Sequence, residues 1–217
     1  MQIYAHRGAS RTHAENTIGA FAEAVRLGVD GIELDIHATS DGVPVVIHDS
    51  SLGRTAGADF EIPDLTLDRL RSIAPTIPTF AEVLDLVGSA LHFDIEVKPA
   101  GIEEPVLELL GRYPQIRWSI SCFDWTVLER FRELDESCDL WLLSSQMSNE
   151  LVETASRLNA TAAALDAPAI KEQTIKIAHD AALKVMAWTV NDVDRARQLE
   201  AWGLDMLCTD APHLFVG

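Results

Sequence analysis

Short runs of apolar and β-branched residues recur along the chain, separated by longer segments. Runs of roughly four to eight such residues bounded by turn residues are typical of buried strands. The run Ala160–Leu165 also suits a helix on local grounds, and the alternation of the segments around it favours a strand. The predicted strands are Gln2–Ala5, Gly31–His37, Val43–His48, Leu91–Lys98, Arg117–Cys122, Leu140–Ser144, Ala160–Leu165, Lys184–Val190 and Met206–Thr209.

The longer segments carry apolar residues at helical spacing. In the segment that follows the first strand, Ile18, Phe21 and Val25 fall on one face of a helix. The other long segments show a similar apolar stripe. The predicted helices are Thr17–Leu27, Ile102–Arg112, Trp125–Leu134, Glu150–Leu158, Lys171–Ala182 and Val193–Trp202.

The alternation of strands and helices with short loops indicates parallel βαβ units. Val43–His48 follows Gly31–His37 across a Ser-Asp-Gly turn, which favours a hairpin partner at the rim. The remaining eight strands predict an α/β fold of the (β/α)8 TIM-barrel type, near the lower end of its length range of roughly 200 to 400 residues. A doubly wound open sheet is the alternative. It usually has a glycine-rich phosphate loop after the first strand, where this chain has His6-Arg7-Gly8.

Residues 50–78 interrupt this alternation with several prolines and glycines and one short helical piece, Leu67–Ile73. We interpret this segment as a short loop insertion after the second βα unit. No flexible linker or low-complexity tract divides the sequence. We therefore expect one barrel domain over residues 1–217.

Composition narrows the functional classes. The 217 residues are 47% hydrophobic and 24% charged, which suits a packed domain and argues against disorder. The apolar runs are shorter than the ~20 residues of a membrane span and no signal peptide is recognisable, so no membrane anchor is expected. Three widely spaced cysteines favour a reducing, cytoplasmic location. The net charge of −17 disfavours nucleic acid and anionic membranes as partners.

Acidic residues cluster on the inward faces of two predicted strands. Glu33 and Asp35 share one face, and Asp94, Glu96 and Lys98 share another, because side chains alternate along a strand. Carboxylates gathered at one barrel mouth repel each other, and a hard divalent cation would relieve the repulsion. Salt bridges at a solvated strand end are the alternative. The clustering favours a metal site made by Glu33, Asp35 and Glu96.

Two histidines end predicted strands beside this cluster. His6 and His48 can serve as general acid or base, because imidazole titrates near neutral pH. Arg7 and Lys98 add cationic donors suited to phosphate oxygens. A cation site, two histidines and two basic residues around one pocket indicate phosphoryl chemistry rather than acyl or sugar chemistry.

The remaining candidates each have two interpretations. Glu15 either orients a site residue or is structural, and Trp188, with Phe123 as a weaker case, either packs the barrel or forms an apolar wall of the substrate pocket. Asn16 or Thr17 is expected to cap the first helix. Asp124 and Asp210 are interpreted as caps of the segments that follow them. The other histidines are expected at the surface or rim, with His37 as the exception; they are His13, His92, His179 and His213.

With these residues in place, the chain resembles the glycerophosphodiester phosphodiesterase family of metal-dependent TIM-barrel hydrolases. The resemblance runs nearly end to end and rests on an ordered series of motifs. They are His6-Arg7-Gly8-Ala9-Ser10, Glu15-Asn16-Thr17, Gly31-Ile32-Glu33-Leu34-Asp35, Asp41 to Asp49, Leu52 with Arg54-Thr55, Asp94-Ile95-Glu96-Val97-Lys98, Phe123-Asp124, Trp188 to Asn191 and Thr209-Asp210.

The resemblance implies roles for the candidate residues. The carboxylates named above would bind one divalent cation, Mg²⁺ or Ca²⁺ with Mn²⁺ as a further option, and Arg7 and Lys98 would hold the phosphate. His6 and His48 would be general base and general acid. A substrate hydroxyl would attack phosphorus to give a cyclic phosphate, His48 would protonate the departing alcohol, and water would open the ring. The products would be an alcohol and sn-glycerol 3-phosphate.

Two departures from the family pattern leave specificity open. Asp94 stands where the family commonly has Asn, and the 50–78 insertion is short. The preferred alcohol, the physiological metal and the oligomeric state stay open. The substrate is expected to be a small glycerophosphodiester. A lysophospholipase D-like activity and a non-catalytic binding barrel are the alternatives. Retention of both histidines and the acidic cluster argues against the second of these.

Overall fold

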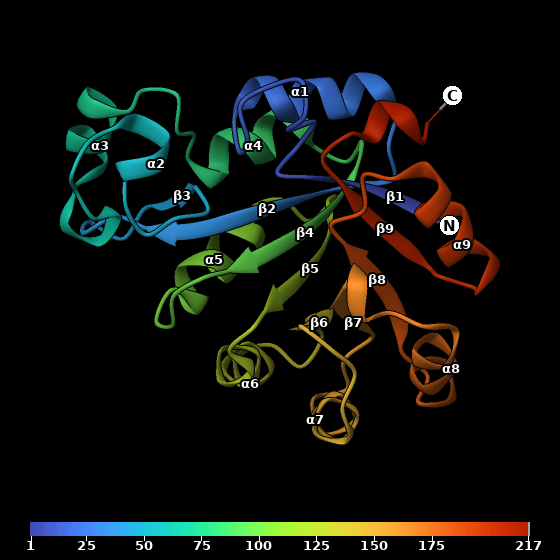
Figure 1. Ribbon diagram of the computed structural model, residues 1–217. Coiled ribbons are helices and arrows are strands. Elements are labelled where there is room, and N and C mark those ends of the chain that lie inside the picture. Colours follow the sequence, from blue (N-terminus) through green and yellow to red (C-terminus); the bar gives the residue numbers. More distant parts are fainter. Residues whose placement is uncertain (217) are drawn as a thin grey trace.

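The computed structural model describes residues 1–216 and shows a closed barrel of parallel strands ringed by helices (Figure 1). Eight strands within these residues follow one another around the barrel, and β1 pairs with both β2 and β9 to close it. The (β/α)8 prediction is confirmed. The strands are β1 Gln2–His6, β2 Gly31–Ala38, β3 Pro44–Val46, β4 His92–Val97, β5 Arg117–Cys122, β6 Leu140–Ser144, β7 Ala162–Asp166, β8 Lys184–Trp188 and β9 Met206–Thr209.

The short strand β3 is the one that does not belong to the barrel within the described residues. It pairs antiparallel with the end of β2, with Ile36 opposite Val46. The predicted rim hairpin is therefore confirmed, although β3 is shorter than Val43–His48. Because β3 runs back beside the end of β2, and the Ile47 N–H donates to the Asp35 carbonyl oxygen, the chain that leaves β3 brings His48 to the C-terminal mouth of the barrel.

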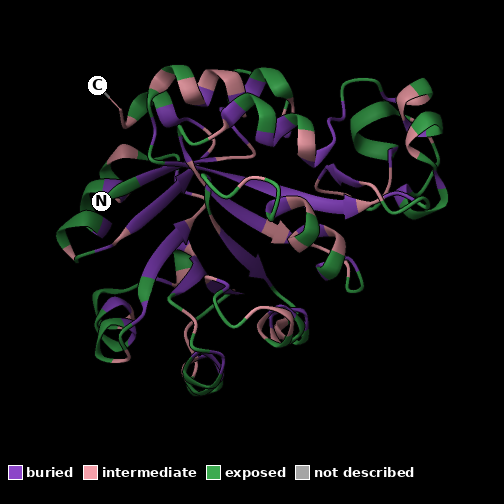
Figure 2. Cartoon of the chain, turned by 180° about the vertical axis from the view of Figure 1, so that it is seen from behind, coloured by how far each residue is buried: buried purple, intermediate pink, exposed green. Residues whose placement is uncertain are grey.

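The helices bury one face against the barrel and expose the other (Figure 2). The first begins at Thr17, whose hydroxyl accepts a hydrogen bond from the Ala20 N–H, and ends at Gly28 in the left-handed conformation. No helix in residues 1–216 is long and apolar enough to cross a bilayer. The helices around the barrel are α1 Ile18–Leu27, α4 Phe80–Val87, α5 Glu103–Leu110, α6 Trp125–Leu134, α7 Asn149–Leu158, α8 Glu172–Asp180 and α9 Val193–Ala201.

Large inward side chains fill the lower part of the barrel. Tyr4 packs edge-on against Trp141 with ring centroids 5.7 Å apart, and Met186 and Met206 pack in the same cluster. Gly31 makes room for this filling, because a Cβ at that position would lie 2.3 Å from the Tyr4 ring. Side chains thus fill the barrel interior toward the N-terminal ends of the strands. Polar inward residues lie between this layer and the mouth at the C-terminal ends of the strands.

The segment 50–78 is more ordered than the predicted loop insertion. It contains α2 Gly53–Ala56, the 3₁₀ turn η1 Ile62–Asp64 and α3 Leu67–Ile73, the last of which was predicted with the same bounds. Leu52 and Leu70 are fully buried in an apolar cluster that is separate from the main core. This segment therefore has a small core of its own beside the barrel.

Helix α4 is a barrel helix that the apolar spacing did not predict. Thr79 and Glu82 form a reciprocal capping box at its start, and Phe80, Val83 and Leu84 are fully buried. Prolines at positions 75 and 78 lie just before it and are typical of a loop. The Thr-x-x-Glu signature ahead of an apolar run is the signal that identifies this helix.

Candidate active site

A cavity of about 80 Å³ opens where the barrel strands end, the position at which TIM barrels carry their chemistry. Asp35 lies fully buried beside it. Glu15 lines a neighbouring hollow together with His48. The predicted site residues that line the cavity itself are His6, Arg7, Glu33, His48, Glu96, Lys98, Phe123 and Trp188.

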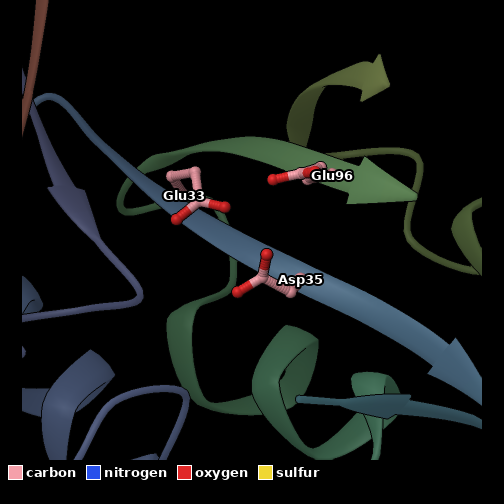
Figure 3. A group of neighbouring side chains, drawn as sticks. All are labelled: Glu33, Asp35 and Glu96. Carbon is pink, nitrogen blue, oxygen red and sulfur yellow. The ribbon is translucent and has the colours of Figure 1, made fainter. Parts of the chain in front are cut away.

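Three carboxylates meet in this region on adjacent strands. Parallel pairing of β2 with β4 places Asp35 directly opposite Glu96, and Glu33 lies two residues earlier on the same face of β2 (Figure 3). One oxygen from each of the three side chains lies within 4.8 Å of the other two. This arrangement offers three hard oxygen ligands to a single small volume, which suits a divalent cation.

Two of the three carboxylates, Glu33 and Glu96, have pKa values raised above the ordinary value of a glutamate. Burial raises the pKa of Glu33 well above its ordinary value, and the nearby Asp35, Glu96 and Asp94 raise it further. Within residues 1–216, Glu33 Oε1 is buried without a hydrogen-bond partner. Burial also raises the pKa of Glu96, against the opposing effect of Lys98. A cation would satisfy the unpartnered oxygen and remove the repulsion, so the residues fit a metal.

Asp35 differs from its neighbours because two cations contact it. Burial acts to raise its pKa, but Lys98 and Arg7 outweigh this effect and hold the pKa below its ordinary value. Lys98 Nζ lies 2.9 Å from Asp35 Oδ1 and also pairs with Glu96, and Arg7 Nε lies 3.2 Å from Asp35 Oδ2. Asp35 is therefore an ionised anchor for both predicted phosphate-binding residues.

The backbone around Arg7 is folded tightly against the acidic cluster. Arg7 has a φ of 56°, in the left-handed region, and its N–H donates to Glu33 Oε2 over 3.0 Å. Gly8 follows with a φ of 79°, and a Cβ there would lie 2.7 Å from the Ala20 backbone. The glycine of the His-Arg-Gly motif thus lets the loop pack on α1 while Arg7 faces the site.

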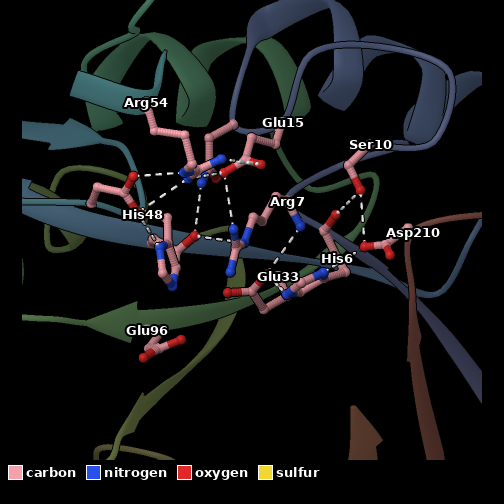
Figure 4. A network of polar contacts seen from close by, with 12 residues as sticks. His6, Arg7, Ser10, Glu15, Glu33, His48, Arg54, Glu96 and Asp210 are labelled. Atoms are coloured by element: carbon pink, nitrogen blue, oxygen red, sulfur yellow. Dashed lines mark hydrogen bonds and ion pairs between the residues drawn. The ribbon is translucent and has the colours of Figure 1, made fainter. Parts of the chain in front are cut away.

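Each of the two histidines at the mouth is oriented by a carboxylate. His6 Nδ1 lies 2.6 Å from Asp210 Oδ1, and His48 Nδ1 lies 2.6 Å from Asp49 Oδ1 (Figure 4). A carboxylate at this distance fixes the proton on Nδ1 and leaves Nε2 as the exchanging atom. The site therefore contains two His–Asp pairs, one at the end of β1 and one after β3, each of which leaves an Nε2 atom free to exchange a proton.

Asp210 is a site residue that the sequence interpretation missed. It was interpreted as a cap of the segment after β9, but its carboxylate accepts hydrogen bonds from His6, Ser10 and Asn191. Burial acts to raise its pKa, and these donors, with His6 foremost, lower the pKa to about 2. Asp210 is separated from His6 by 204 positions, so only closure of the barrel between β1 and β9 reveals the pair. Asp124, by contrast, caps α6 as predicted.

The three residues of the Glu15-Asn16-Thr17 motif make different contacts. Thr17 is the helix cap, as expected. Asn16 does not cap; its side chain is buried and its Nδ2 donates to Asp35 Oδ2 over 2.7 Å, because a left-handed φ of 55° turns it toward the barrel. Glu15 accepts a hydrogen bond from Arg7 Nη1 over 2.9 Å. Glu15 and Asn16 both support the charged residues of the site.

Two aromatic residues line the same cavity. Phe123 and Trp188 pack edge to face with ring centroids 5.6 Å apart, and half of Phe123 is exposed. Both line the cavity, and a role as an apolar wall for the substrate stays a prediction. They add apolar surface to a cavity that is otherwise lined by several charged side chains.

Two further histidines lie inside the barrel. His37 is buried and its Nε2 lies 3.1 Å from the His48 carbonyl oxygen, so it supports the segment that carries His48. His92, expected at the surface or rim, is half-buried at the start of β4, at the N-terminal end of the barrel, where it stacks on Trp141 with ring centroids 5.5 Å apart. Burial lowers the pKa of His92 to about 4.

The fold and this site define a TIM-barrel enzyme with the groups needed to cleave a phosphate ester. The sequence profile of the Glycerophosphoryl diester phosphodiesterase family matches residues 6–214. The chain belongs to this family, whose members are phosphoric diester hydrolases.

Comparison with individual proteins agrees with this assignment. A glycerophosphodiester phosphodiesterase of Caldanaerobacter subterraneus is 30% identical over 99% of this chain and 96% of its own length. Among solved structures, an Oleispira antarctica phosphodiesterase in complex with the product sn-glycerol-3-phosphate superposes with a TM-score of 0.93 and 26% identity, covering 99% of this chain and 94% of that one. A glycerophosphodiester phosphodiesterase of Thermotoga maritima gives 0.89 and 27%, covering 100% and 97%.

Proposed function

We propose that the protein hydrolyses small glycerophosphodiesters, such as glycerophosphocholine or glycerophosphoethanolamine, to an alcohol and sn-glycerol 3-phosphate. The observation that carries this proposal is the pair of carboxylate-oriented histidines on either side of the acidic triad. The product bound to the Oleispira antarctica phosphodiesterase, whose fold matches over nearly the whole chain, supports the same reaction.

The proposed roles follow the contacts of each residue. Glu33, Asp35 and Glu96 would hold one divalent cation, Mg²⁺ or Ca²⁺ with Mn²⁺ as a further option. When bound, the cation supplies neutralisation of charge at the phosphate. Arg7 and Lys98 hold the phosphate oxygens, since both already lie at the cavity wall and carry donors that Asp35 fixes in place.

The histidines move the protons of the reaction. His6 Nε2 takes the proton of the substrate hydroxyl beside the ester as that hydroxyl attacks phosphorus. His48 Nε2 donates its proton to the departing alcohol oxygen as the P–O bond breaks. The result is a cyclic phosphate. Water then opens the ring, with His48 taking a proton from water and His6 returning one to the hydroxyl.

The protein's high acidity is compatible with this anionic substrate. The net charge is −17, but salt at physiological concentration screens exposed charges over roughly 8–10 Å. Carboxylates on the outer surface therefore have little effect on the potential inside the cavity. Within the cavity, Arg7 and Lys98 and a cation on the triad reverse the local field. Phe123 and Trp188 are proposed to cover the glycerol carbons.

A substrate panel tests the proposal. The purified protein is incubated with glycerophosphocholine, glycerophosphoethanolamine and a lysophospholipid, with Mg²⁺, Ca²⁺ or Mn²⁺, and release of sn-glycerol 3-phosphate is measured by a coupled dehydrogenase assay. Release from the small diesters, abolished by chelator and restored by cation, is expected. Silence on every diester with each cation contradicts the proposal. The lysophospholipid is followed instead by release of its headgroup alcohol, because its other product would keep the acyl chain and would not be sn-glycerol 3-phosphate. Cleavage of the lysophospholipid alone would support a lysophospholipase D-like activity.

A further inference from the structure

Arg54 lies on α2, in the 50–78 segment, and its side chain reaches back to the mouth of the barrel. Its Nε and Nη2 donate to the two oxygens of Asp49, over 2.6 and 3.1 Å. Its Nη1 and Nη2 donate to the two oxygens of Glu15, over 2.9 and 2.7 Å. One guanidinium thus grips two carboxylates, each through two hydrogen bonds (Figure 4).

Both carboxylates that Arg54 contacts also contact proposed site residues. Asp49 Oδ1 is the acceptor of His48 Nδ1, and Glu15 Oε1 is the acceptor of Arg7 Nη1. The two carboxylates come from different loops of the barrel, 34 positions apart in the sequence (49 minus 15). Arg54 is therefore the group that connects the loop after β1 to the chain after β3.

We infer that Arg54 is a positioning residue, which holds Asp49 in the orientation that presents His48 Nε2 to the departing alcohol. The inference rests on the proposed function. A partly exposed aspartate next to a histidine in sequence has several rotamers, and the two-point grip of a planar guanidinium selects one of them. A lysine carries the same charge but lacks the planar set of N–H donors of a guanidinium, so it cannot fix both carboxylate oxygens of Asp49.

The local fold does not depend on this side chain. Arg54 is about half exposed, and α2 is anchored through the buried Leu52 in the separate apolar cluster of this segment. The backbone hydrogen bonds of Leu52 N to Phe60 O and Ile62 N to Ser50 O close the segment without Arg54. Variants at this position are therefore expected to fold, with a melting temperature close to that of the parent protein.

The test compares two substrates that differ in their need for a proton on the leaving group. Glycerophosphocholine releases an alkoxide unless an acid protonates it, whereas the p-nitrophenyl ester of glycerol 3-phosphate releases a stable phenolate. If Arg54 positions His48, the kcat of Arg54→Gln falls about 10–100-fold on glycerophosphocholine, the range typical for a lost supporting contact. On the nitrophenyl ester the loss is expected to stay within about threefold, because little acid assistance is needed there.

Two further variants sharpen the result. Arg54→Lys is expected to show the same selective loss on glycerophosphocholine, because charge without the planar set of N–H donors does not position Asp49. Arg71→Gln is the matched control, since Arg71 is a partly exposed arginine of the same segment that pairs with a single carboxylate, Glu82, and does not line the cavity. It should leave both rates unchanged.

Four outcomes separate the claims. Equal losses on both substrates, or unchanged rates in Arg54→Gln, overturn the positioning role while the parent enzyme's activity still supports the proposed function. Full activity of Arg54→Lys also overturns it, because charge alone would then suffice. An inactive parent enzyme on both substrates contradicts the proposed function itself.

Discussion

Binding of a divalent cation should stabilise the folded protein, and this stabilisation should be lost when the Glu33 carboxylate is removed. The perturbation is Glu33→Gln, which removes one of three carboxylates whose oxygens converge within 4.8 Å. Glutamine keeps an oxygen that can accept the Arg7 N–H hydrogen bond made by Glu33. The substitution therefore removes the negative charge and leaves the shape of the site nearly unchanged.

The size of the effect follows from linkage. A cation present at about 100 times its Kd stabilises the folded state by about 2.7 kcal/mol. Unfolding entropy of about 2.1 cal/mol/K per residue, over 217 residues, converts this energy to a rise in Tm of about 6 °C. Without cation, the variant should be at least as stable as the parent protein, because the parent buries an unpartnered Glu33 oxygen among like charges.

The assay is thermal unfolding of both proteins in chelator and in excess Mg²⁺, Ca²⁺ or Mn²⁺. The parent protein should gain about 6 °C with at least one cation, and Glu33→Gln should gain none. Glu103→Gln is the control, since Glu103 is also a buried glutamate but begins α5, and it should keep the full gain. The reasoning is refuted if Glu33→Gln responds like the parent, or if it is several degrees less stable in chelator.

Three further outcomes are expected. Asp210→Asn should lower kcat about 10–100-fold with the fold intact, because His6 loses its ionised partner; parent turnover would exclude this role. Gly8→Ala should lower the free energy of unfolding by about 2–4 kcal/mol, measured in urea, because its Cβ meets the Ala20 backbone and its φ is positive. His92 has a pKa of about 4, below its unfolded value of 6.5, so its contribution is complete above pH 6.5 and is lost as pH falls toward 4. Relative to His92→Phe, the parent should lose about 3 kcal/mol over that window in urea titrations, and parallel pH profiles would contradict this.

The repeating parts of the fold could be predicted because they depend on local pattern. Strand and helix periodicity located the barrel strands, and the alternation of faces on β2 and β4 was enough to group Glu33, Asp35 and Glu96 as neighbours, which the register of the two strands confirms. These features follow from the two-residue repeat of a strand and from the parallel register of successive units.

The supporting contacts could not be predicted in the same way. The bonds of Asp210 to His6 and of Arg54 to Glu15 join residues far apart in the sequence, and nothing in their own neighbourhoods distinguishes them from a cap or a surface arginine. They form only when the barrel closes and the 50–78 segment folds beside it. The predicted list of site residues therefore contained His6 without Asp210, and Glu15 without Arg54.

The most direct test of the proposed chemistry is the kcat/KM of His48→Ala on the same two substrates. If His48 Nε2 protonates the departing alcohol, kcat/KM on glycerophosphocholine should fall by about 10²–10⁴-fold, while the p-nitrophenyl ester of glycerol 3-phosphate should lose far less. Parent-like turnover of glycerophosphocholine, or an equal loss on both substrates, would contradict a general acid at His48 and with it the two-histidine mechanism.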